Sequence, residues 1–313
     1  MTNRFASLIA LLFVLTMGAC QENDTQIIPE TEASTPDDLN SDFEDDSVDI
    51  FETLLRANLD YARRLENVSY GILKANIAAC PETQRSIGIK VHTIYDYPSE
   101  LQMHARVFLD LDTALRIRMV ATGSPAETSG LKVGDRIVSL GGETIPTGEN
   151  AGDVYQALSR NEYSLGSVSM EIERQGEIIT VNLAPDTICG YSAQLFYDDI
   201  VNAHTDGSDI WVTTELLRII DEDVSLALIV AHELAHAVKG HIFLEPTPAL
   251  ELEADRLSLF YLARAGYDPE EAVRLWQSNP LNFEMDLSNS HPSRQERLDV
   301  LQQALRDLRS TDP

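Results

Sequence analysis

Hydrophobic positions along the chain fall into three successive patterns. Between residues 47 and 79 they recur at steps of three and four, which predicts one long amphipathic helix. Between residues 83 and 185 they form short β-branched runs separated by glycines, which predicts a small β domain. From residue 189 onward a strand-like run is followed by helix-periodic stretches. We therefore expect an α+β fold, with a small β-barrel domain followed by a mainly helical domain that contains a short sheet.

Capping and turn residues refine the middle pattern. Ser124 is placed to cap a short helix with Pro125 at its first position, and Gly130 is placed to end that helix. The expected elements of this part are strands at 87–91, 117–121 and 136–140, a helix at 150–160, and a hairpin of strands 168–174 and 178–183. The last part is expected to contain a strand at 209–214 and helices at 215–220, 224–241, 249–265, 270–277 and 293–308.

The helix expected at 224–241 carries the most specific chemical signal, the run His232-Glu233-Leu234-Ala235-His236. Residues four apart lie on one face of a helix, so His232 and His236 can bind a single metal ion. Two imidazoles and a later carboxylate form a zinc site that leaves a position open for water, and Glu233 stands beside it as a proton acceptor. The alternative is an amphipathic helix with two surface histidines. The apolar residues around the run favour burial, and therefore a metal site.

The third ligand is expected from the helix at 249–265. Glu251 and Asp255 are four residues apart and share a face, whereas Glu253 points to the other side. His241 lies five residues after His236, which is about 140° around a continuous helix, so it is not expected to bind the metal.

The His-Glu-x-x-His helix followed by Glu251-x-x-x-Asp255 resembles the gluzincin endopeptidases of the CAAX prenyl protease and HtpX-like family. The resemblance covers roughly residues 189–309. It implies that Glu251 is the third ligand of one zinc ion per chain and that Asp255 steadies a ligand histidine. A solvated helix face is the alternative for both acids.

Two further segments resemble the same family. Residues 202–203 and 210–214 resemble its strand above the cleft, which aligns the substrate backbone. The segment His291-Pro292-Ser293 with Arg297 resembles its C-terminal His-Pro segment. This resemblance implies that His291 stabilises the developing oxyanion or binds the metal in a resting state. The alternative is a surface histidine where a helix begins.

The middle part has its own resemblance. Its Gly-Ser-Pro-Ala string at 123–126, followed by Gly-Leu at 130–131 and Gly-Asp at 134–135, resembles bacterial PDZ domains. PDZ domains bind an extended peptide as an added strand at a sheet edge. The resemblance implies that the backbone at Ile87, Gly88 and Ile89 holds a peptide carboxylate.

The same resemblance places the helix at 150–160 along the peptide groove. It implies that Val154 and Leu158 line this groove, although both are equally expected in the domain core. The segment 95–111 is longer than PDZ domains lead us to expect, and covering the groove is one role open to it.

The overall charge excludes one class of partner. The 313 residues carry a formal net charge of −28, which argues against nucleic acid, because phosphate binding needs clustered Lys and Arg. The stretch 21–46 is rich in Asp and Glu and contains no Lys or Arg, so we expect a disordered tether there.

The first twenty residues have the pattern of a targeting segment. Arg4 precedes an apolar run at 6–17 that is too short to span a bilayer. Gly18-Ala19-Cys20 then resembles the cleavage box of bacterial lipoproteins, which implies a lipid anchor at Cys20; an ordinary secretory signal is the alternative. The expected location is the periplasmic side of the cell envelope, as an outer-membrane lipoprotein.

Cys80 and Cys189 are the two remaining cysteines. Export would place them in an oxidising compartment, where a disulfide would tie the segment before the middle domain to the segment after it. Two buried free thiols are the alternative.

The expected function is that of a zinc-dependent endopeptidase of the bacterial envelope. It would act on misfolded or misassembled proteins, which its PDZ domain would position. The alternatives are a non-catalytic peptide-binding adaptor or chaperone and, less favoured, a zinc hydrolase of non-peptide substrates. The expected boundaries are 1–20 for the signal peptide, 21–46 for the tether, 47–82 for the N-terminal helix, 83–187 for the PDZ domain and 188–313 for the peptidase domain.

Overall fold

The long helix expected near the N-terminus is α1 (Ile50–Ala75). The computed structural model describes residues 50–278 and 292–311, so the expected signal peptide, tether, Cys20 and His291 lie outside the described residues. The buried face of α1 includes Leu55, Leu59, Leu65, Val68 and Ile72, as its apolar repeat predicts. From Phe51 onward the chain forms one compact unit, to which α1 belongs.

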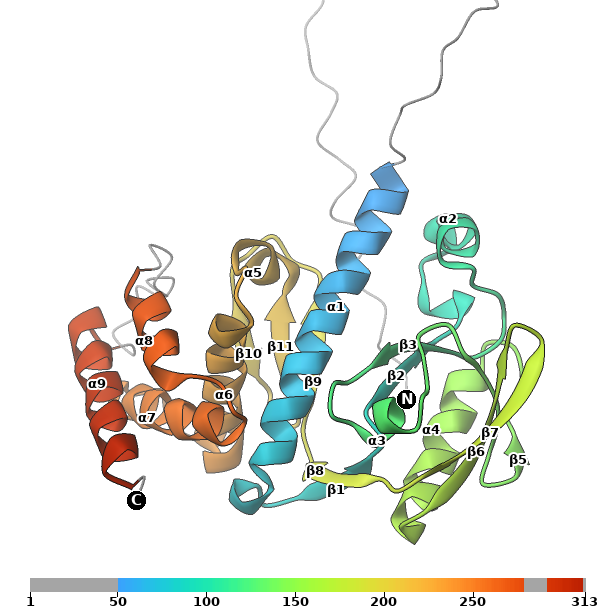
Figure 1. Ribbon diagram of the computed structural model, residues 1–313. Coiled ribbons are helices and arrows are strands. Elements are labelled where there is room, and N and C mark those ends of the chain that lie inside the picture. Colours follow the sequence, from blue (N-terminus) through green and yellow to red (C-terminus); the bar gives the residue numbers. More distant parts are fainter. Residues whose placement is uncertain (1–49, 279–291, 312–313) are drawn as a thin grey trace, which may run out of the picture. The chain divides into compact units, whose positions relative to one another are not determined.

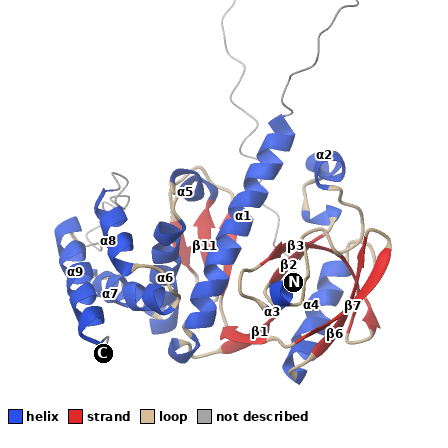
Figure 2. Ribbon diagram, viewed as in Figure 1, coloured by secondary structure: helices blue, strands red, loops and turns tan. Residues whose placement is uncertain are grey.

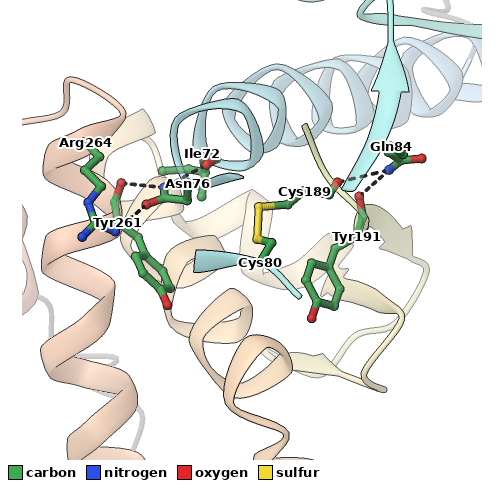
Figure 3. The surroundings of a disulfide bond; sticks show 8 residues. All are labelled: Ile72, Asn76, Cys80, Gln84, Cys189, Tyr191, Tyr261 and Arg264. Atoms are coloured by element: carbon green, nitrogen blue, oxygen red, sulfur yellow. Dashed lines mark hydrogen bonds between the residues drawn. A yellow bond between two sulfur atoms is a disulfide. The ribbon is translucent and has the colours of Figure 1, made fainter. Parts of the chain in front are cut away.

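A short ladder and a disulfide join the two ends of the middle domain. After α1, the chain passes through η1 (Ile77–Ala79) and enters β1 (Thr83–Ser86), which pairs antiparallel with β8 (Asp186–Cys189). Cys80 and Cys189 form a disulfide with their Cα atoms 5.6 Å apart (Figure 3). The disulfide expected from the sequence is therefore confirmed, and it joins residues 109 positions apart.

The middle domain is an antiparallel sheet with a helix against it (Figure 1). Its strand order is β2-β3-β4-β6-β7, and β5 pairs with β4. The strands are β2 (Ile89–His92), β3 (Arg116–Val120), β4 (Arg136–Leu140), β5 (Glu143–Thr144), β6 (Val168–Arg174) and β7 (Glu177–Leu183), and the helical elements are α3 (Pro125–Thr128), α4 (Ala151–Glu162) and η3 (Tyr163–Leu165). A core of its own, which includes Ile117, Ile137 and Met170, holds the domain together.

The turn chemistry of this domain is that expected from the sequence. The Ser124 hydroxyl accepts a hydrogen bond from the Glu127 amide, and Pro125 starts α3. Asp135 is buried; it accepts a hydrogen bond from the Lys132 amide and pairs with Arg174 at 2.6 Å. This ion pair, in which Asp135 is buried and Arg174 is partly exposed, holds the turn that leads into β4.

Segment 95–111 forms a helix that the sequence analysis did not identify. It contains α2 (Ser99–Leu109), preceded by η2 (Ile94–Asp96). Ile94, Ala105 and Leu111 form a small core with Leu55 of α1, and the His104 ring contacts Phe51. These contacts attach the segment to the start of α1.

The last part of the chain is mainly helical, with one short sheet (Figure 2). Strand β11 (Asp209–Thr213) lies between β10 (Ala203–Thr205), which is antiparallel to it, and β9 (Ser192–Phe196), which is parallel. The helical elements are α5 (Thr214–Ile219), α6 (Asp223–Lys239), η4 (His241–Phe243), α7 (Pro248–Arg264), α8 (Pro269–Ser278) and α9 (Arg294–Thr311). These sheets and helices confirm the expected α+β class.

Helix α1 belongs to the core of this helical part. Leu65, Val68 and Ile72 pack in one cluster with apolar residues of α6 and α7. At the end of α1, the buried Asn76 amide donates to the carbonyl oxygens of Ile72 and Tyr261, which joins α1 to α7 (Figure 3). The first helix thus completes a core formed by residues more than a hundred positions later.

No helix within residues 50–278 and 292–311 combines the length and apolar character that crossing a membrane requires.

Truncating the buried face of α1 is expected to destabilise the fold. Leu65 is fully buried, so Leu65→Ala should lower the free energy of unfolding by about 2–5 kcal/mol through lost burial and the cavity left behind. Leu54→Ala is the matched control, because Leu54 lies on the same helix at 50% exposure and should change stability by less than about 0.5 kcal/mol. Urea denaturation measures both. Equal effects would contradict the assignment of α1 to the core.

Candidate metal centre

Helix α6 is largely apolar but carries three polar residues of the candidate site. Its buried residues include Leu226, Val230, Leu234 and Ala235, and it packs against β10, β11, α7 and α8. The helix ends at Gly240, which takes φ +66° and donates its amide to the carbonyl oxygens of α6's last turn. His232, Glu233 and His236 lie within this surrounding and are each partly buried.

Three donor atoms converge between α6 and α7. The Nε2 atoms of His232 and His236 are 3.1 Å apart, and each lies 3.5 Å from a carboxylate oxygen of Glu251. Within the described residues, this is the only group of three or more His, Cys, Asp or Glu side chains with metal-binding spacing. Bonds of about 2.0–2.2 Å in a tetrahedral zinc site put neighbouring donors roughly 3.3–3.5 Å apart. Glu251 Oε2 lies 3.5 Å from the His232 nitrogen and Glu251 Oε1 lies 3.5 Å from the His236 nitrogen, so the two imidazoles and the carboxylate have spacings close to those of such a site.

The outer nitrogens of both rings already have partners. His232 Nδ1 is 3.1 Å from Asp255 Oδ1, and His236 Nδ1 is 3.1 Å from His241 Nδ1. If each Nδ1 carries the ring proton, both Nε2 atoms present lone pairs to the same point. Two facing lone pairs repel unless a cation lies between them, so the chemistry of the donor set fits a divalent metal ion.

Asp255 is held from a second side by α9. Arg297 donates two hydrogen bonds to its carboxylate, at 2.7 and 2.6 Å, and both side chains are largely buried. Burial by itself would raise the pKa of Asp255, but the hydrogen bonds from Arg297 and His232 lower it to about 2. Asp255 is therefore ionised at neutral pH. The sequence analysis placed Arg297 in the His-Pro segment without giving it this role.

The two histidines of the cluster, His232 and His236, have opposite pKa shifts. Burial favours the neutral form of His232, but its hydrogen bonds to Asp255 and Glu251 prevail and raise the pKa to about 9. For His236, burial and the neighbouring His232 lower the pKa to about 4. With protein groups alone around them, the pair thus holds one positive charge at neutral pH. A bound metal cation would supply that charge.

Glu233 is tied to the edge strand of the sheet. Its carboxylate accepts a hydrogen bond from the Thr205 amide of β10. Burial raises the pKa of Glu233 to about 7, while the charge of His232 opposes that rise. Strand β10 pairs with β11 on one side only among the described residues, so an edge strand lies beside this carboxylate.

His241 occupies a place that the sequence analysis did not predict. The expectation assumed that the helix continued through residue 241, but α6 ends at Lys239 and the left-handed Gly240 turns the chain. His241 is consequently buried, with its ring against His236. It is not one of the three converging donors. Gly240 was the sequence signal for the end of this helix, because glycine is common just after the last residue of a helix.

The groove residues of the middle domain lie where a PDZ domain would need them. Gly88 takes φ +78° just before the edge strand β2, and a side chain there would collide with Ser124. The Ile87 side chain is buried in the core, so only its backbone is available to a ligand. Val154 and Leu158 are partly buried and pack against the core that Ile89 also contacts. Their partial burial is consistent both with side chains that line a groove and with side chains at the edge of the domain core.

Comparisons with protein families match two overlapping parts of the chain. The PDZ domain family matches residues 116–174, and the family described as peptidase family M48 matches residues 167–247 and 247–305. Among curated proteins, the mitochondrial serine protease HTRA2 of Bos taurus is 29% identical over 104 residues, which are 33% of this chain and 21% of that protein. The chain thus spans about a fifth of the length of this relative.

Solved PDZ domains resemble part of the chain. The HtrA3 PDZ domain bound to a phage-derived ligand is 20% identical with a TM-score of 0.25, covering 34% of this chain and 89% of that one. The PDZ domain of EpsC from Vibrio cholerae is 18% identical with a TM-score of 0.21, covering 31% and 94%. The family matches confirm the expected membership. Together with the convergent His-His-Glu group, which is consistent with a His-Glu-x-x-His zinc site, they identify residues 167–305 as a metallopeptidase region of family M48, with a PDZ domain at residues 116–174.

Proposed function

We propose that this metallopeptidase is an endopeptidase of the bacterial cell envelope that cleaves misfolded or misassembled proteins presented by its PDZ domain. The observation that carries the catalytic part is the convergence of His232, His236 and Glu251 beside the Glu233 carboxylate and the edge strand β10. In the proposed site, His232, His236 and Glu251 hold one zinc ion per chain.

A zinc ion held there supplies a Lewis acid that polarises the scissile carbonyl and acidifies the attacking water. Glu233 is the proposed general base and, afterwards, the acid that returns the proton to the leaving amine. Its hydrogen bond from the Thr205 amide fixes the carboxylate in one orientation.

Strand β10 is the proposed guide for the substrate. A peptide that adds to the free edge of β10 would lie beside Glu233, because the Thr205 amide already contacts that carboxylate. The sequence resemblance indicated a substrate-aligning strand at 202–203 and 210–214; in the structure β11 is the middle strand, and β10 is the member at the edge. His291, the proposed oxyanion stabiliser, lies outside the described residues.

The PDZ groove is the proposed binding site for substrate segments. The edge of β2 would pair with an extended peptide, and the backbone at Ile87, Gly88 and Ile89 would hold its carboxylate. Val154 and Leu158 would contact the apolar side chains of that peptide. Support for this role comes from the edge position of β2 and from the partly buried side chains of Val154 and Leu158, which pack against the same core as Ile89.

The proposed location rests on the N-terminal sequence. The apolar run at 6–17 and the small residues before Cys20 support export and lipid anchoring, and the acidic stretch 21–46 would act as a tether. The disulfide Cys80–Cys189 is consistent with an oxidising compartment such as the periplasm.

Removing the proposed base should separate zinc binding from cleavage. Glu233→Gln is expected to lower kcat on a casein-like substrate by about 10²–10⁴-fold, because the amide cannot take a proton, while the zinc content stays near one per chain. Glu222→Gln, at the exposed start of the same helix, should leave both unchanged. Zinc analysis and a fluorogenic protease assay measure the pair. Undiminished cleavage by Glu233→Gln would exclude this base, and peptide binding without any cleavage by the wild type would favour an adaptor.

Neutralising Asp255 should weaken the metal site. Asp255→Asn leaves the Arg297 charge buried without its counter-ion and loosens His232, so zinc affinity should fall about 10–100-fold and stability by about 3–5 kcal/mol. Chelator competition and urea denaturation measure these effects. Asp307→Asn, whose partner Arg256 is 47% exposed, should cost less than about 1 kcal/mol. An unchanged zinc affinity in Asp255→Asn would contradict its proposed role.

A charge in the PDZ groove should block peptide capture without touching the metal site. Leu158→Glu is expected to weaken binding of peptides with a free carboxylate at least about tenfold, because it places an acid beside the bound chain. Leu165→Glu is the control, since Leu165 is 72% exposed and lies after α4. Fluorescence polarisation with labelled peptides measures binding. Equal peptide affinities of the two variants would place the binding site elsewhere.

A further inference from the structure

We propose that His241 is a positioning residue that fixes the orientation of His236, as the middle member of a chain Glu253–His241–His236. This inference rests on the proposed role of His236 as a zinc ligand. The Nδ1 atoms of His241 and His236 are 3.1 Å apart, and the His241 Nε2 atom is 3.4 Å from Glu253 Oε2. The two rings lie edge to face, with centroids 5.0 Å apart and an interplanar angle of 78°.

The proton positions along this chain follow from the metal site. A His236 ring that offers its Nε2 lone pair to a cation must carry its proton on Nδ1. That N–H points at His241 Nδ1, which must then be an acceptor. The His241 proton is consequently on Nε2, where Glu253 accepts it. All donors and acceptors in the chain are matched with both rings neutral.

The position of His241 depends on the turn at Gly240. The positive φ of Gly240 ends α6 and directs the next residue back toward the helix, where the His241 side chain is only 4% exposed. A buried imidazole without hydrogen-bond partners is costly, so its two nitrogens need the contacts they make here. Glu253, on α7, is held in turn by Lys239, the last residue of α6, at a distance of 2.8 Å.

The two ligand histidines are therefore held by different kinds of partner. His232 donates to the Asp255 carboxylate, whose charge is balanced by Arg297. His236 donates to a neutral imidazole, which places the carboxylate of Glu253 one residue further from the metal. Because the partner of His236 is a neutral ring, no second buried cation is needed to balance it, whereas Arg297 balances the charge of Asp255. Loss of such an outer partner typically lowers metal affinity about 10–100-fold.

Substitutions at His241 can separate a hydrogen bond from packing. In His241→Asn the side-chain oxygen stands near the former Nδ1 and can still accept from His236. In His241→Gln the amide reaches toward Glu253 instead, and His241→Leu removes both contacts. We expect zinc affinity, measured by competition with a chromophoric chelator on the full-length chain, to stay within about threefold of wild type for Asn and to fall about 10–100-fold for Gln and Leu.

The outer carboxylate provides a test that does not disturb the buried ring. Glu253 is 42% exposed, so Glu253→Leu should fold normally and lower zinc affinity about threefold. Glu245→Leu, in the exposed connection after η4, should bind zinc as the wild type does. Unfolding temperatures in excess chelator establish that the variants share one fold.

Each outcome has one reading. An equal loss of zinc affinity in the Asn, Gln and Leu variants of His241 would show that His241 acts through packing. Wild-type zinc affinity in the Gln or Leu variant would show that His241 does not act on the metal site. Either result overturns the inference. Identical affinities of the Glu253 and Glu245 variants would remove Glu253 from the chain. A wild-type protein that binds no zinc would instead overturn the proposed function.

Discussion

The active centre depends on holding two imidazole nitrogens 3.1 Å apart inside an apolar helix. This arrangement is unfavourable for the protein alone, because two buried lone pairs face each other and one of the rings tends to take a proton. The surrounding structure maintains it by binding each ring from behind, through Asp255 for His232 and His241 for His236. These contacts orient the two rings toward one point, and such pre-orientation lowers the reorganisation that metal binding requires.

The supports of the site come from widely separated parts of the sequence. Helix α6 provides two ligands and the carboxylate of Glu233, α7 provides Glu251 and Asp255, and α9 provides Arg297. Helix α1 contributes Leu65 and its neighbours to the core under α6. A loss of packing in α1 is expected to reach the metal centre through this common core, although α1 has no residue among the converging donors.

Local patterns predicted the parts of the site that depend on helix geometry. His232 and His236 are four apart on one helix, as are Glu251 and Asp255, so their faces follow from the period alone. The role of Arg297 was not visible, because its contact with Asp255 spans 42 positions and needs the packing of α9 on α7. His241 was misplaced because the helix was extended through Gly240. Helix α2 was missed although Leu101, Ala105 and Leu109 recur at steps of four, because segment 95–111 was considered only as an insertion.

The chain enters and leaves the middle domain at two adjacent points. Strands β1 and β8 lie side by side there, and the Cα atoms of Cys80 and Cys189 are 5.6 Å apart. A linker of about two or three residues spans such a gap, so the middle domain has the geometry of an insertion between α1 and the helical part that follows. A different domain at this place would have to supply two sets of contacts to α1. One is that of Met119 and Ala121, which belong to the cluster around Leu65, and the other is that of Ile94, Ala105 and Leu111 with Leu55.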